Sequence, residues 1–181
     1  MKFKNYSTQA VVLARKSISE ADRILVLFTK DFGRIAVIAK GVRKPKSRKR
    51  GHIEVFNQIR FSATKTRGLD IMTEVEIINS FPLVRKNLKK MSLAYYFMEV
   101  VGKTTREGEK HMEVYDLLLN FLMRLEKVTE LKKLRFEFIN DILVTLGFWP
   151  KGKIIFDPDE VLQEVTERNM SSARVGKIIS S

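Results

Sequence analysis

The chain has 181 residues, 44% apolar and 30% charged, and its 34 Lys and Arg against 21 Asp and Glu give a formal net charge of +13. Such apolar content excludes a disordered tail, and the lack of any run of about 18 apolar residues excludes a predicted transmembrane helix. The absence of cysteine excludes disulfide-stapled modules, thiol nucleophiles and cysteine-ligated metal sites. Because the N-terminal residues lack the apolar segment of a signal peptide, we expect a cytoplasmic protein of one or two small domains.

Short apolar runs in the first half of the chain predict β-strands. Runs rich in Val and Ile at residues 9–14, 23–29 and 34–40 are typical of strands that are buried on at least one face. The glycine of Lys30-Asp31-Phe32-Gly33 suits a hairpin turn between the second and third runs, because glycine readily adopts positive φ. The first 40 residues therefore predict three strands.

Two further strands are indicated by apolar residues at odd-numbered positions with polar residues between them. The apolar positions are Ile53, Val55, Ile59 and Phe61 in residues 53–62 and Ile71, Val75 and Ile77 in residues 71–77, as expected of strands with one solvent-exposed face. Five strands in this short a segment favour a small barrel, because closure removes exposed sheet edges.

The apolar spacing becomes helical after residue 82. Apolar residues three or four positions apart predict three helices, over about residues 88–98, 114–125 and 131–146. Gly147 is suited to end the third helix, and Asp157-Pro158-Asp159-Glu160 has the pattern of a capped helix start. We therefore expect an α+β protein whose second part is a helical bundle.

The positive charge is concentrated in one segment. Residues 1–90 carry a net charge of +14 and residues 91–181 a net charge of −1. Residues 40–50, called the basic loop below, contain seven cations and no acid: Lys40, Arg43, Lys44, Lys46, Arg48, Lys49 and Arg50. Such clustering is typical of a surface that binds a polyanion, and nucleic acid is favoured over a merely solvated loop.

Other cations lie at predicted strand ends or turns, where they would extend a nucleic-acid-binding track. We include Arg34, Lys65 and Arg67 in the predicted surface. Arg15, Lys16 and Arg23 have similar positions, and each of these six cations taken alone also fits an ordinary surface charge.

Two aromatic residues are candidates for stacking on unpaired bases, as in proteins that bind single strands. Phe32 lies in a predicted turn, and Phe56 lies on the strand face opposite Ile53 and Val55. Core packing is the favoured role for both aromatic side chains.

The sequence offers little support for catalysis. Gly102-Lys103-Thr104 resembles the end of a phosphate-binding loop, but position 97 is Phe where that motif requires Gly. His52 and His111 have no partner at metal-ligand or triad spacing, and the acids at residues 157–160 are explained by a helix cap. We expect neither an enzymatic activity nor a resident metal.

Several motifs, met in order within residues 1–150, resemble the bacterial RecO family of recombination mediators. Ala-Lys-Gly-Val-Arg-Lys-Pro-Lys-Ser-Arg at residues 39–48 is the most specific of them. The other motifs are Ser-Glu-Ala-Asp-Arg-Ile-Leu-Val-Leu-Phe-Thr at 19–29, Phe-Gly-Arg at 32–34, Arg-Gly-Leu-Asp at 67–70, Glu-Ile-Ile-Asn-Ser-Phe at 76–81 and Leu-Gly-Phe at 146–148.

The resemblance implies an OB-fold barrel over residues 1–82 and an α-helical domain over residues 83–181. It implies a non-catalytic protein of recombinational DNA repair, located in the cytoplasm with the nucleoid and not in a membrane. Such a protein would bind single- and double-stranded DNA and anneal complementary strands. With RecR it would help to load RecA onto DNA covered by single-strand-binding protein. The basic loop would belong to its DNA-binding surface.

The chain departs from the family pattern near its C-terminus. Many members have a four-cysteine zinc site soon after the third helix, whereas residues 151–156 here contain no cysteine, so we expect no zinc. The helical domain also looks trimmed, and residues 168–181 match the family only vaguely.

Two other functions fit the same barrel and charge. One is an RNA-binding OB-fold protein of the translation apparatus, and the other is an adaptor whose basic loop binds an acidic protein tail. Competition between DNA and RNA of matched sequence distinguishes the first, and binding of an acidic peptide without DNA distinguishes the second.

Overall fold

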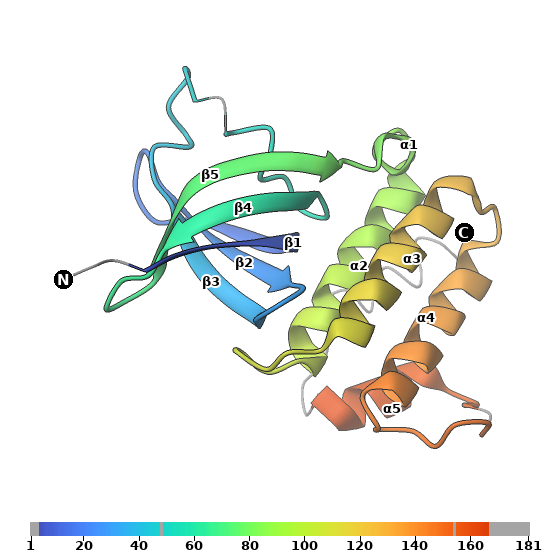
Figure 1. The fold of residues 1–181 in the computed structure, drawn as a ribbon. Coiled ribbons are helices and arrows are strands. Elements are labelled where there is room, and N and C mark those ends of the chain that lie inside the picture. The colour runs from blue at the N-terminus through green and yellow to red at the C-terminus, as the bar shows by residue number, and fades with distance from the viewer. Residues whose placement is uncertain (1–3, 48, 154, 167–181) are drawn as a thin grey trace. The chain divides into compact units, whose positions relative to one another are not determined.

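The computed structural model describes residues 4–47, 49–153 and 155–166 (Figure 1). The chain divides into two compact units. The first contains residues 1–80 together with 105–111, and the second contains the two remaining stretches, 81–104 and 112–181. Residues 105–111, which lie between two helices in the sequence, therefore belong to the strand unit.

The first unit is a closed five-stranded barrel. Around the ring the strands follow the order β1-β2-β3-β5-β4, and every pair is antiparallel except β3 with β5. The strands are β1 (Asn5–Ser17), β2 (Arg23–Thr29), β3 (Gly33–Ala39), β4 (Gln58–Thr64) and β5 (Asp70–Asn79). The barrel is OB-like, which confirms the predicted fold of the N-terminal part.

Strand β1 is longer than the apolar run at residues 9–14 that predicts it. Its first half pairs with β4 and its second half with β2, and the register shifts between Val12 and Ala14. Such an irregularity bends a strand, which allows β1 to contact both neighbours as the ring closes. The polar ends of β1 escaped prediction because they are held by pairing and not by burial.

The predicted strand over residues 53–62 is wrong in its first half. Residues 53–57 belong to the long β3–β4 connection (residues 40–57), and β4 begins only at Gln58. Phe56 has a φ of 59°, which no extended strand allows. Ile53 and Val55 are buried because the connection folds back onto the barrel, so their alternation does not arise from a strand.

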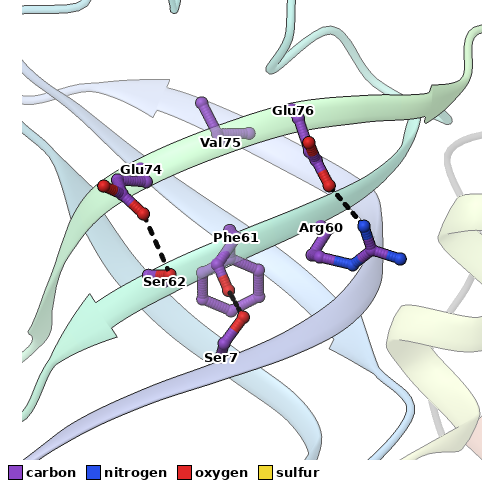
Figure 2. Close-up of a pocket in the computed structure, with 7 residues that line it drawn as sticks. All are labelled: Ser7, Arg60, Phe61, Ser62, Glu74, Val75 and Glu76. Atoms are coloured by element: carbon purple, nitrogen blue, oxygen red, sulfur yellow. Dashed lines mark hydrogen bonds and ion pairs between the residues drawn. The ribbon is translucent and has the colours of Figure 1, made fainter.

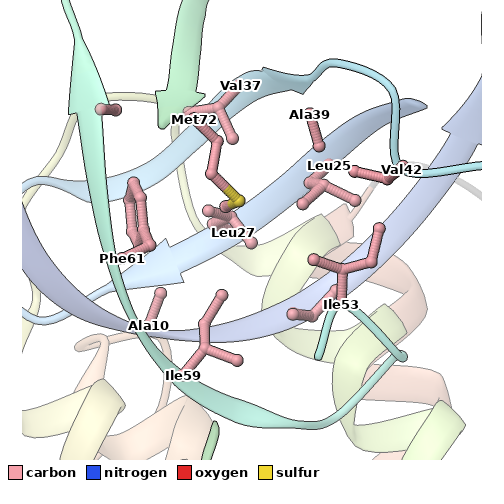
Figure 3. Packing of buried hydrophobic residues seen from close by; sticks show 12 residues of the cluster. Ala10, Leu25, Leu27, Val37, Ala39, Val42, Ile53, Ile59, Phe61 and Met72 are labelled. Carbon is pink, nitrogen blue, oxygen red and sulfur yellow. The ribbon is translucent and has the colours of Figure 1, made fainter. Parts of the chain in front are cut away.

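The barrel core includes side chains from the β3–β4 connection. Figure 3 shows Val42 and Ile53 among core residues of the strands, such as Leu25, Leu27 and Ile59. Val42 is 1% exposed and Ile53 is fully buried. Burial of a side chain of this size contributes about 1.5–3 kcal/mol, so the connection is fixed to the barrel at both ends of its basic part.

Residues 105–111 cover the part of β3 that β5 does not reach. The register of β3 with β5 covers only Val37 and Ile38 of β3. Arg34 instead forms a parallel bridge with Glu107, and its carbonyl oxygen accepts a hydrogen bond of 2.8 Å from the N–H of Gly108. The segment thereby satisfies backbone groups at an otherwise open sheet edge.

The second unit is helical, which confirms the predicted α+β class. One aromatic side chain from each of three helices, Phe97, Phe121 and Phe138, packs in a cluster with ring centroids 4.0–6.0 Å apart. The helices are α1 (Pro82–Arg85), α2 (Leu88–Thr104), α3 (Met112–Lys127), α4 (Leu131–Thr145) and α5 (Pro158–Thr166). Of the helices in the described ranges, none has the length and apolarity needed to span a bilayer.

Both predicted helix signals near the C-terminus are confirmed. Gly147 follows α4 with a φ of 77°, the left-handed conformation that glycine adopts at helix ends. Asp157 Oδ1 accepts hydrogen bonds of 3.0 Å from the N–H groups of Asp159 and Glu160, which makes Asp157 the cap of α5. The tail at residues 168–181 lies outside the described residues.

Candidate nucleic-acid interface

The first half of the basic loop is tied to the β1–β2 turn. The N–H of Gly41 donates to Asp22 Oδ1 at 2.7 Å, and the N–H of Arg43 donates to the carbonyl oxygen of Ala21 at 3.0 Å. The guanidinium of Arg43 also donates to the carbonyl oxygen of Ser19 at 2.7 Å. Loop and turn therefore present one continuous surface.

The second half of the β3–β4 connection is tied to β5. Lys49 Nζ donates to the carbonyl oxygen of Thr73, and His52 Nδ1 lies 3.1 Å from the carbonyl oxygen of Val75. The buried side-chain amide of Asn57 donates to the carbonyl oxygen of His52 at 2.9 Å. These bonds explain His52 as a structural residue and hold the connection on two sides of the barrel.

The cations between these anchors face solvent. Figure 1 shows the β3–β4 connection as a long loop that projects beyond the strands of the barrel. The exposed predicted site residues of the loop are Lys40, Arg43, Lys44, Lys46 and Arg50, while Lys49 is half-buried. Arg48, also a predicted site residue, lies outside the described residues. The described part of the loop thus offers several solvated cations on an anchored base.

An arginine cluster beside the β1–β2 turn consists of Arg23 and the three arginines whose charges act on it, Arg15, Arg43 and Arg50, with Glu54 as the acid that acts on Arg23. Arg15 forms an ion pair with Glu54, and Nη1 of the half-buried Arg23 is buried without a hydrogen-bond partner among the described residues. Burial lowers the pKa of Arg23, and the charges of Arg15, Arg43 and Arg50 act in the same direction while Glu54 opposes them. One carboxylate cannot neutralise four guanidinium groups, so the cluster favours a bound anion.

From the sequence, Arg15 and Arg23 are candidates to extend the basic track, but each taken alone also fits an ordinary surface charge. They come together because antiparallel pairing of β1 with β2 places Ser17 opposite Arg23 and Arg15 opposite Leu25. The β1–β2 turn then holds Arg43 next to them. Only strand pairing reveals this cluster, so no local signal in the sequence predicts it.

The three predicted site residues outside the loop lie elsewhere on the barrel. Arg34 is the second residue of β3, and about 20 Å of extended strand separates it from Lys40, which follows the other end. Lys65 and Arg67 are exposed residues of the β4–β5 turn. The structure therefore splits the predicted surface into a loop group and a second group near the opposite end of β3.

A pocket of about 300 Å³ lies beside this second group, and we call it the turn pocket. It is lined by Tyr6 of β1, Asp31 and Phe32 of the β2–β3 turn, Ile35 of β3, Lys65 and Asp70 from either end of the β4–β5 turn, and Gly108 and Lys110. The hydroxyl of Tyr6 donates to Asp70 Oδ2 at 2.9 Å. Burial, reinforced by this hydrogen bond and by the charge of Asp70, raises the pKa of Tyr6 well above its ordinary value.

A second pocket, of about 340 Å³, lies on the outer face of β1, β4 and β5 (Figure 2). Figure 2 shows Arg60 pointing toward Glu76, at 2.5 Å, and Ser62 beside Glu74, at 3.5 Å. Two carboxylates and one guanidinium give this pocket a net negative charge, which disfavours phosphate. We therefore do not assign this face to nucleic acid.

The structure also places the aromatic and histidine residues that the sequence suggested as candidate site residues. Phe56 is fully buried, which confirms its predicted core role. Phe32 is 39% exposed on the β2–β3 turn, so its predicted core role is wrong. His111 is half-buried with Nε2 3.6 Å from Glu109 Oε1. Nowhere in the described ranges do three His, Asp or Glu side chains gather as a metal site would require.

Comparison with known proteins identifies the family. The family model "Recombination protein O N terminal" matches residues 1–81, and "Recombination protein O C terminal" matches residues 85–152. The chain is 37% identical over 148 residues to the DNA repair protein RecO of Desulforudis audaxviator, covering 82% of this chain and 59% of that protein.

Two further relatives carry the same name. The DNA repair protein RecO of Pelotomaculum thermopropionicum is 36% identical over 147 residues, covering 81% of this chain and 57% of that protein. The corresponding protein of Dehalococcoides mccartyi is 31% identical over 147 residues, covering 81% of this chain and 58% of that protein. The chain thus spans less than two thirds of the length of these relatives. Since the two family models follow one another along the barrel and the first helices, the chain belongs to the RecO family.

Proposed function

We propose that this chain is a non-catalytic DNA-binding protein of recombinational DNA repair that binds single- and double-stranded DNA and anneals complementary strands. The observation that carries the proposal is the anchored basic loop together with the arginine cluster. Cations fixed on a rigid barrel contact phosphates at little cost in conformational entropy, and they release counterions when they do so.

The charge pattern supports binding with little sequence preference. Exposed Lys and Arg side chains contact phosphates, which are the same in every sequence, and the cations of the loop that the structure describes are exposed or half-buried, as suits phosphate contacts. Annealing follows from the same surface. Two strands held by one cationic surface repel each other less, and each raises the local concentration of the other.

Membership of the family extends this proposal to partners. We propose that the chain acts with RecR and helps to load RecA onto DNA covered by single-strand-binding protein, in the cytoplasm at the nucleoid. Residues 91–181, which make up most of the helical unit, have a near-neutral charge that suits protein contacts rather than phosphate.

The loop is tested by replacing Arg43, Lys44, Lys46 and Arg48 together with Ala. We expect weaker binding of single-stranded DNA at moderate salt and a shallower salt dependence, by about 0.7 in the log–log slope for each lost phosphate contact. A matched control removes four exposed lysines of the helical unit, Lys86, Lys89, Lys132 and Lys133. Unchanged affinity in the loop variant, or an equal loss in the control, would overturn the assignment of the loop.

Annealing is tested directly with complementary strands covered by single-strand-binding protein, across a salt series. The proposal expects the wild-type chain to accelerate annealing over the spontaneous rate, and it expects the acceleration to fall as salt screens the loop. No acceleration at any salt concentration would defeat the mediator function. Competition with RNA of matched sequence identifies an RNA-binding protein instead if RNA displaces DNA.

A further inference from the structure

The turn pocket has the volume and the lining of a ligand-binding site, and it is distinct from the basic loop. Its volume of about 300 Å³ lies at the lower end of the range for small-molecule sites. Its walls come from the β2–β3 turn, the β4–β5 turn, the strands β1, β3 and β5, and residues 105–111. Hydrogen-bonded turns and strands form most of the pocket, so its shape exists before any ligand arrives.

Phe32 gives the pocket an accessible aromatic surface. The N–H of Phe32 donates to Thr29 Oγ1 at 2.9 Å, which fixes the turn on which the ring stands. The ring meets Tyr6 edge-to-face, with centroids 5.1 Å apart and an interplanar angle of 73°. This contact holds the ring in place while 39% of the residue stays exposed. A preorganised, exposed ring of this kind is the feature on which nucleobases stack.

Two lysines supply positive charge at the rim. Lys65 and Lys110 line the pocket, both are exposed, and neither forms an ion pair with a described residue. Lys65 Nζ lies 5.9 Å from the centroid of the Tyr6 ring, which places its charge beside the aromatic pair. Because these ammonium groups are uncommitted, they are available to a phosphate that accompanies a stacked base.

Two carboxylates supply hydrogen-bond acceptors inside the same pocket. Asp70 is held by the hydroxyl of Tyr6 and by the N–H of Thr66, and Asp31 accepts a hydrogen bond of 2.5 Å from Thr8. Oδ1 of Asp31 accepts no hydrogen bond from the described residues. The Watson–Crick edge of a base, which carries its ring N–H donor and one N–H of its amino group, is accessible to such oxygens only when the base is unpaired.

We propose that the turn pocket binds one unpaired nucleotide of single-stranded DNA, with its base stacked on Phe32 and its phosphate beside Lys65 and Lys110. This inference rests on the proposed function and adds a second contact region near the opposite end of β3 from the basic loop. The loop engages phosphates of either single strands or duplexes, whereas the turn pocket recognises only single strands.

The test compares the affinities of wild-type chain and Phe32→Ala for a single-stranded oligonucleotide and for a blunt duplex of equal length. We expect Phe32→Ala to weaken single-strand binding about 5- to 150-fold, the range for one stacked base, and to leave duplex binding within about twofold. Phe32→Tyr, which keeps the ring, should restore single-strand binding. Phe136→Ala in α4 removes an equally exposed phenylalanine, at 40%, and should change neither affinity.

A second variant keeps the inference testable if Phe32→Ala alters the barrel, which circular dichroism and thermal melting would reveal. Lys65→Ala/Lys110→Ala leaves the aromatic pair intact and should lower the salt slope for single strands by about 0.7, as for the loss of one neutralised phosphate. If folded Phe32→Ala bound single strands as well as the wild-type chain does, or lost equal affinity for single strands and duplex, the assignment of the turn pocket as a site for an unpaired nucleotide would be overturned. If the wild-type chain bound neither DNA, the proposed function itself would fail.

Discussion

Gly33 and Glu109 approach so closely that a Cβ atom on Gly33 would lie 1.9 Å from the carbonyl oxygen of Glu109. Gly33 also has a φ of 67°, which side chains other than glycine rarely adopt. The close contact with Glu109 and the positive φ therefore both restrict the residue at position 33, where residues 105–111 pass across the start of β3. Glycine is the residue that satisfies both of them.

Gly33→Ala should destabilise the chain by about 2 kcal/mol or more, because the left-handed conformation alone costs about 1–2 kcal/mol and the contact with Glu109 adds to it. Urea denaturation measures the loss. Gly108→Ala is the matched control: its φ is 74°, but a Cβ there would meet no described atom within 4 Å beyond its chain neighbours, so only the conformational cost applies. Equal losses in the two variants would show that the close approach to Glu109 contributes nothing.

Glu54→Gln should strengthen DNA binding several-fold at low salt. The carboxylate of Glu54 competes with phosphate for Arg15, and its removal leaves Arg15 without its ion-pair partner and Arg23 without the one acid that acts on its pKa. Glu76→Gln makes the same change in net charge on the β4–β5 face, where Glu76 pairs with Arg60, and should alter binding much less. Fluorescence anisotropy across a salt series compares the two. A similar gain in both variants would mean that net charge and not the cluster controls affinity.

Arg135→Ala should destabilise the helical unit by about 2 kcal/mol. The Arg135 side chain, 12% exposed, pairs with Asp159 of α5 and lies 4.6 Å from the centroid of the Tyr96 ring, so its loss removes an ion pair and a packed contact together. Lys133→Ala removes one partner of a pair that is 71% exposed on both sides and should cost less than about 0.5 kcal/mol. Chemical denaturation followed by circular dichroism tests the difference, and similar losses would contradict it.

The stability of the chain should fall above pH 10, partly through Tyr6. Because burial and Asp70 raise the pKa of Tyr6 in the folded state, the neutral phenol stabilises the fold fully below the ordinary value of 10.0. This contribution is lost as the pH rises toward the folded-state pKa. Tyr6→Phe should therefore show a smaller loss of unfolding free energy between pH 9 and pH 11 than the wild-type chain does. Tyr95→Phe, at a 43% exposed position, controls for removal of a phenol.

Much of the fold is predictable because its elements obey local rules. The apolar runs of β2 and β3 and the helical spacing of α3 and α4 arise from faces that are buried continuously. Residues 53–57 do not follow this rule. Ile53 is buried, but it belongs to a connection that folds over the barrel and not to a strand. A period of two shows which residues are buried, but not whether a strand buries them.

The candidate site is only partly predictable, for a different reason. The basic loop is contiguous in sequence, so composition alone reveals it. The arginine cluster needs the pairing of β1 with β2, and the turn pocket needs Tyr6, Phe32 and Lys110 to meet from three distant segments. Tyr6 and Lys110 carry no local signal of their own, because their role depends entirely on which neighbours the barrel gives them.

The position of residues 105–111 sets an order for biosynthesis. A ribosome makes β1 to β5 first and then all of α2 before it makes Gly108, which pairs with Arg34 of β3. A nascent chain that has completed its five strands therefore still presents an uncovered sheet edge at Arg34, where another chain can add a strand. Cover for the start of β3 is thus delayed until residues 105–111 have followed α2, and we expect a chain whose translation stalls within α2 to leave this edge exposed.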